Sequence, residues 1–122
     1  MMRKTIASAA LLACLTAASA QATCIYPRAP EHVPDGKTAS EEEMVAAHQA
    51  VSQFNEDVTA YNACLDMEMM SYEQSGQFDQ ARLLELRAMQ AKKNNAAVDE
   101  VQSVADQFNE QLRIFKNRDK KD

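Results

Sequence analysis

The sequence predicts an all-α fold: a long antiparallel two-helix hairpin, coiled-coil-like in its packing, with an extended N-terminal arm that a disulfide tethers to it. Three observations support this prediction. Apolar residues recur at helical spacing through two long stretches without proline, and all three prolines lie in one short segment ahead of them. Two cysteines remain once an N-terminal export signal is set aside, and two cysteines can form one disulfide.

Residues 1–22 have the features of a secretory signal peptide. Arg3 and Lys4 give a positive start, a short apolar stretch follows, and small residues then offer cleavage after Ala20 or Ala22. The apolar stretch is too short to span a bilayer stably, and later apolar runs are shorter still. We therefore expect no transmembrane segment in the mature chain.

The compact, alanine-rich signal looks bacterial, so we expect a periplasmic protein or one secreted into the medium. The alternative is a lipoprotein anchored through Cys14. Cleavage after Ala22 leaves 11 basic and 18 acidic residues, a net charge of −7. Because nucleic-acid binding depends on cationic side chains, this balance argues against a nucleic-acid partner.

The arm comprises residues 23–39, where proline excludes a regular helix and favours an extended backbone. Cys24 begins the arm and Cys64 lies in the first helical stretch, so in an oxidising compartment we predict a Cys24–Cys64 disulfide. In the chain-entropy model, closing a loop of this length stabilises the fold by about 4 kcal/mol.

The first helix is expected over about 41–74. Ser40 and Glu43 have the spacing of a capping box, and Gly76 is suited to end the helix. One seam of apolar residues at heptad spacing runs along it, formed by Met44, Ala47, Val51, Phe54, Val58, Tyr61, Leu65 and Tyr72.

A turn at about 75–78 leads to a second helix over about 79–118, completing a hairpin domain over residues 40–122. The polar segment Lys92–Asn95 is where a kink or break in this helix would fall. With a turn at Gly76, the numbers of opposed residues should add to about 152, which places Gln90 opposite Asn62.

The apolar face of the second helix is wider than one partner helix needs, about 120°. It consists of Ala97, Val98, Val101, Val104, Ala105, Phe108, Leu112 and Phe115. Either the arm or a second subunit should cover it, the latter making a four-helix bundle from two hairpins. We therefore name Val98, Ala105, Leu112 and Phe115 as the candidate interaction surface.

Little in the composition suggests catalysis or a cofactor. The chain has only two glycines and two histidines, and a two-helix hairpin offers scarcely any interior in which a nucleophile, a base and an orienting acid could converge. The alternative is a Cu(I)-binding or other metal-handling protein that uses Met67, Met69 and Met70, since thioethers are soft ligands. Packing is the competing explanation for these methionines.

The leading hypothesis is an exported, non-catalytic small helical protein that acts by protein–protein interaction in the bacterial cell envelope, its partner an unidentified protein or a second copy. In general architecture the expected hairpin resembles helical-hairpin proteins of that compartment, such as long-armed periplasmic chaperones. The resemblance is one of shape and transfers no functional residue.

Overall fold

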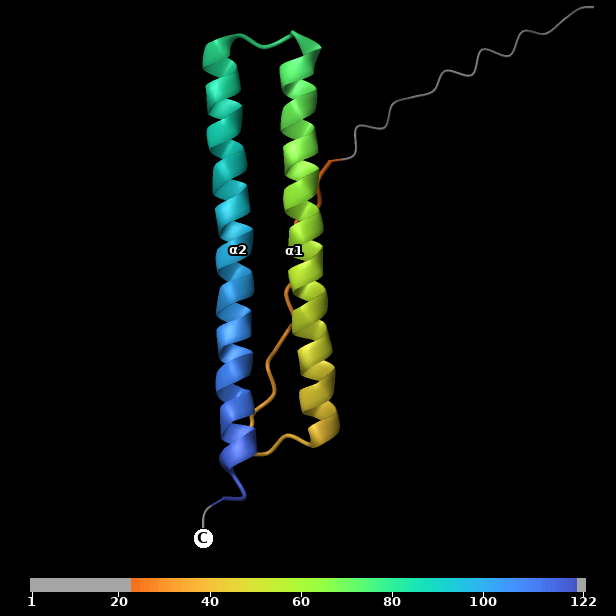
Figure 1. Ribbon diagram of the computed structural model, residues 1–122, viewed down its shortest axis with the longest axis vertical. Helices are drawn as coiled ribbons and strands as arrows, with labels where there is room; N and C mark the ends of the chain where they lie inside the picture. The colour runs from red at the N-terminus through yellow and green to blue at the C-terminus, as the bar shows by residue number, and fades with distance from the viewer. Residues whose placement is uncertain (1–22, 121–122) are drawn as a thin grey trace, which may run out of the picture.

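The computed structural model describes residues 23–120 and confirms the all-α hairpin. Helix α1 spans Glu41–Ser75 and helix α2 spans Gln80–Asn117, and the two lie antiparallel along their full length (Figure 1). The expected signal peptide, its two cleavage sites and the lipidation alternative at Cys14 lie outside the described residues. No helix within residues 23–120 is long and apolar enough to cross a membrane.

The helix ends follow from local hydrogen bonding. The capping box at the start of α1 is present: the Glu43 amide donates to Ser40 Oγ at 3.1 Å, and the Ser40 amide donates to Glu43 Oε2 at 2.7 Å. Helix α1 ends at Gly76, whose φ of 67° lies in the left-handed region. Asp79 caps α2 by accepting a hydrogen bond from the Arg82 amide.

Helix α2 is continuous through the segment 92–95, so the kink or break that this polar sequence allowed for does not form. Lysine has high helix propensity, and asparagine is disfavoured only mildly. Packing against α1 therefore suffices to hold the segment in the helix.

Two clusters of buried side chains hold the helices together. One occupies the middle of the hairpin and the other its open end, away from the turn. The middle cluster consists of Phe54, Val58, Tyr61, Leu65 and Ala97. The end cluster consists of Ala39, Met44 and Phe108. Every α1 residue in these clusters belongs to the heptad seam expected from the sequence.

The register between the helices differs from the expected one. Gln90 donates a hydrogen bond to Asp66 rather than lying opposite Asn62, and His48 contacts Phe108. The numbers of both contacting pairs add to 156 instead of 152. The reason is the connection, which spans residues 76–79, so the hairpin turns about two residues beyond Gly76.

The corrected register places Asn62 at the level of Asn94, since these numbers also add to 156. The side-chain oxygens Oδ1 of both residues are buried and have no hydrogen-bond partner. A polar layer therefore interrupts the apolar seam within the middle cluster, between Tyr61 and Leu65 of α1. Such layers reduce stability and help to specify register.

Candidate interaction surface

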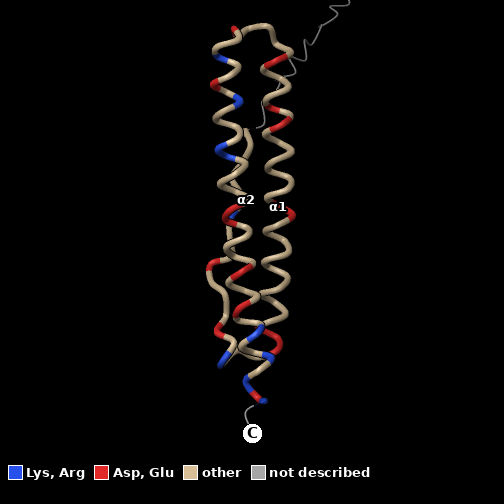
Figure 2. Tube along the Cα trace, turned by 60° about the vertical axis from the view of Figure 1, so that its left-hand side comes forward, with Lys and Arg blue, Asp and Glu red and all other residues tan. Residues whose placement is uncertain are grey.

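The arm is tied to the hairpin at its N-terminal end by the predicted disulfide. The Cα atoms of Cys24 and Cys64 are 5.7 Å apart, and the arm runs from this point down to the start of α1 (Figures 1 and 2). Helix α1 continues beyond Cys64 toward the turn, and of the described arm residues Thr23 alone reaches past the disulfide, where it lines a depression with Met67 and Tyr72. A disulfide of this kind indicates an oxidising compartment.

Tyr26 connects the arm to both helices. Its ring packs edge-on against Tyr61 of α1 with 5.3 Å between centroids, and its hydroxyl donates to Glu100 Oε2 of α2 at 2.6 Å. This hydrogen bond, followed by burial, raises the pKa of the Tyr26 hydroxyl to about 12. The arm therefore lies over the groove between the helices.

The lower part of the arm is fixed to α2. The Gly36 amide donates to Gln111 Oε1 at 2.8 Å, and Val33 packs against the end cluster. Arg118 follows α2, donates to the carbonyl oxygen of Ala39 at 2.6 Å and lies 4.3 Å from the centroid of the Phe115 ring. One side of the hairpin groove is thus covered from its open end to the disulfide.

The opposite side of the same groove is not covered by the arm. A depression of about 370 Å³ lies there, and no arm residue lines it. Its lining comes from α1 (His48, Val51, Ser52 and Asn55) and from α2 (Val101, Ala105, Phe108, Asn109 and Leu112). We call this side of the hairpin the open face.

An apolar stripe on α2 continues the open face toward the turn. Its members are spaced seven residues apart, and residues at this spacing stay on one side of a helix with only a slow drift. They are Leu84, Ala91, Val98, Ala105 and Leu112. Leu84 is 62% exposed and Val98 is 39% exposed, whereas Ala105 and Leu112 are half-buried at the groove.

The structure separates the four residues that we selected as an interaction surface. Val98, Ala105 and Leu112 belong to the stripe on the open face. Phe115 instead packs beside the arm, with Val33 and Arg118. The four selected residues do not include Leu84 and Ala91, although a spacing of seven residues backward from Val98 reaches both.

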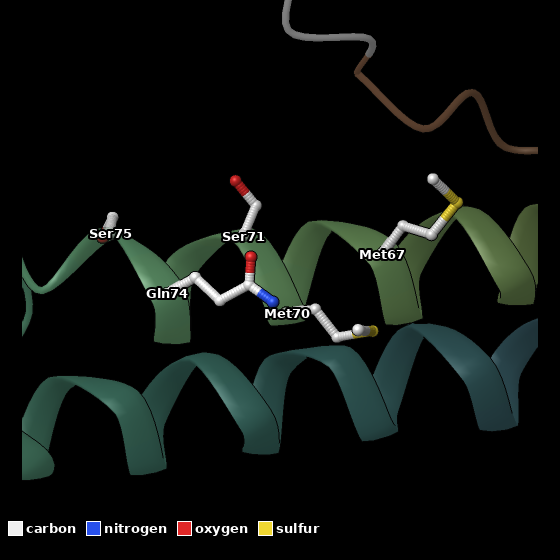
Figure 3. A pocket seen from close by; sticks show the side chains of 5 residues that line it. All are labelled: Met67, Met70, Ser71, Gln74 and Ser75. Carbon is white, nitrogen blue, oxygen red and sulfur yellow. The ribbon is translucent and has the colours of Figure 1, made fainter.

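The three methionines of the copper alternative do not point to one place. Met69 faces the helix interface and is 7% exposed, while Met67 and Met70 are 72% and 54% exposed. Met67 and Met70 line one shallow depression on the outside of α1 (Figure 3), and Met69 does not reach it. Within residues 23–120 there is also no group of three His, Cys, Asp or Glu residues placed to hold a metal ion.

The helices differ strongly in charge. Helix α1 carries eight acidic residues and no basic one, whereas α2 carries six basic and five acidic residues. The basic residues of α2 lie at its two ends, in 82–93 and 113–116, and the acidic ones of α1 lie mostly at 41–43 and 66–73. In the observed register these oppositely charged segments lie at the same levels (Figure 2).

One cross-helix ion pair shows this matching directly. Arg87 Nη2 of α2 lies 2.5 Å from Glu73 Oε1 of α1, near the turn. Both side chains are partly exposed, so the pair adds little stability, but it shows that the acidic helix attracts the basic segments of α2.

Comparison with protein-family models, curated proteins and solved structures finds no match to this chain. Functional inference therefore depends on the surface itself.

Proposed function

We propose that this chain is an exported, non-catalytic helical protein that acts by binding another protein through the open face. The observation that supports the proposal is the apolar stripe Leu84–Leu112, which the arm leaves uncovered although it covers the other side of the same groove. Exposed apolar side chains repeated along one side of a helix, such as Leu84 and Val98, are a feature of helices that pack against a partner.

Export is proposed from the signal-like N-terminus together with the disulfide, which is stable in oxidising compartments such as the bacterial periplasm. We propose a non-catalytic role because the sequence has only two histidines and the depression on the open face is shallow. The burial of Met69 at the helix interface, apart from Met67 and Met70, does not favour the copper alternative.

Site-specific photo-crosslinking in exporting cells tests the proposal. A photoreactive residue at Val98 should give a defined crosslinked product, because this position lies on the open face. The same residue at Ser103, an exposed position of α2 outside the stripe, is the matched control. Equal labelling from the two positions, or no product from Val98, would contradict the proposal.

A further inference from the structure

We propose that the open face binds a second copy of this chain, forming an antiparallel four-helix bundle in which α1 of each copy lies beside α2 of the other. The inference rests on the proposed function, since it names the partner of the same surface. The spacing of the apolar residues on the open face indicates that the partner is a helix. Where α2 lines the depression, Val101, Ala105, Phe108 and Leu112 have the alternating spacings of four and three residues with which one helix packs against another, whereas an extended segment would need contacts at every second residue.

Charge determines how the second copy would be oriented. Helix α1 has eight acidic residues and no basic one, so an arrangement with α1 against α1 of the partner copy is repulsive along its length. A two-fold axis parallel to the hairpin places α1 beside the partner copy's α2, with both turns at the same end. This arrangement preserves the level of each residue.

The charged segments then match at both ends of the bundle. Segment 41–43 of α1 lies at the level of 113–116 in the partner copy's α2, and segment 66–73 lies at the level of 82–93. The acidic and basic segments that lie at the same levels within one hairpin (Figure 2) would therefore also lie at the same levels between copies. The same complementarity occurs twice, as a two-fold contact requires.

The arm leaves this arrangement unobstructed. It lies on the opposite side of the groove, held by Tyr26 and the disulfide, so both arms would be on the outside of the bundle. From Leu84 to Leu112 the stripe is about 42 Å long at 1.5 Å per residue, and two packed helices are about 20 Å wide. The face can therefore bury about 800 Å² per copy, the area of a standard stable interface.

Sedimentation velocity of the purified, oxidised protein at tens of micromolar tests the proposal. The expected result is a dimer, and Val98→Glu should raise its dissociation constant about 100-fold, because the two-fold axis places the charge in the interface twice. Ser103→Glu is the matched control and should leave the dimer intact. Circular dichroism of each variant verifies that the hairpin is still folded.

Crosslinking between two different variants provides a second measurement. Thr59 of one copy should lie near the level of Val98 in the other, so mixing Thr59→Cys and Val98→Cys proteins with a short bis-maleimide should give a mixed dimer. Pairing Thr59→Cys with Ser103→Cys should not. A monomer at these concentrations, or a dimer that Val98→Glu leaves unchanged, overturns the inference. If photo-crosslinking at Val98 then captures a different protein, the proposed function stands without it.

Discussion

Replacing Gly36 by alanine should release the lower part of the arm from α2. A Cβ at this position would overlap the backbone carbonyl oxygen of Gln111 and lie 2.9 Å from the backbone nitrogen of Phe115. Both neighbouring atoms belong to a helix backbone, so no side-chain rotation can make room. The arm must therefore move outward.

The magnitude follows from what this movement breaks. Overpacking against rigid neighbours costs about 1–3 kcal/mol. The outward movement also weakens the hydrogen bond from the Gly36 amide to Gln111 Oε1, worth about 1 kcal/mol. Ala39, a member of the end cluster, and Val33, which packs against that cluster, lie on either side of Gly36 in the sequence and lose part of their burial as well. We expect the free energy of unfolding to fall by about 3 kcal/mol, a large part of a small domain's stability.

Urea unfolding followed by circular dichroism, with the disulfide intact, measures the effect. Gly76→Ala provides the comparison, because a Cβ there has no atom within 4 Å and meets only the left-handed backbone, at about 1 kcal/mol. Hydrogen exchange should show faster exchange of the Ala39 amide, which bonds to Asp35, in the Gly36 variant alone. If Gly36→Ala is as stable as the unsubstituted protein within about 0.5 kcal/mol, this result contradicts the close packing of Gly36 against the α2 backbone at Gln111.

Three further predictions follow from the arm and the polar layer. Reducing the Cys24–Cys64 disulfide should lower the free energy of unfolding by about 4 kcal/mol in urea titrations, and a loss below about 1 kcal/mol would contradict the tethered-arm account. Tyr26 should ionise near pH 12 in absorbance titrations that use Tyr26→Phe as the blank. Because the pKa of Tyr26 is raised in the folded state, the free energy of unfolding should decline between about pH 10 and 12. Ionisation of Tyr26 near pH 10 would show that its hydrogen bond to the Glu100 carboxylate is absent. Replacing Asn62 and Asn94 together by leucine should raise the free energy of unfolding by about 1–2 kcal/mol, since two buried unpartnered oxygens disappear; a loss of stability would show that the amides pair with each other.

Local signals in the sequence were sufficient for most of the fold. The capping box at Ser40 predicts the start of α1, because its side chain and Glu43 satisfy amides that no other group can reach. Gly76 predicts the end of α1, because few residues other than glycine adopt a positive φ there. Heptad spacing predicts the seam, and the two cysteines that follow the expected signal peptide predict the disulfide.

The register between the two helices and the edge of α2 that the arm follows depend on tertiary geometry, which local sequence signals do not determine. The expected register missed by about two residues in each helix because it assumed a hairpin centred on Gly76, whereas the connection continues to Asp79. The width of the apolar face on α2 predicted that a further segment besides α1 packs on it, and the arm does so. Periodicity alone did not indicate along which edge of α2 the arm would lie. Phe115 lies on the covered edge and Val98 on the open one, although both fit the same helical pattern.

The arm's contacts explain why one edge is closed and the other left open. Tyr26 requires an acceptor across the groove, which Glu100 supplies, and Gly36 requires a side-chain acceptor, which Gln111 supplies. Both acceptors lie on the same side of α2, so the arm follows that side and the disulfide fixes it there. The stripe on the open edge of α2 consists of alanine, valine and leucine instead, with Asn109 beside it, and these apolar side chains can pack against a helix but cannot hold an extended backbone by hydrogen bonds. One edge of α2 therefore offers hydrogen-bond acceptors suited to the arm, and the other offers apolar side chains suited to a helix of a second copy. Exchanging Glu100 or Gln111 for an apolar residue should loosen the arm without improving the stripe that binds a helix.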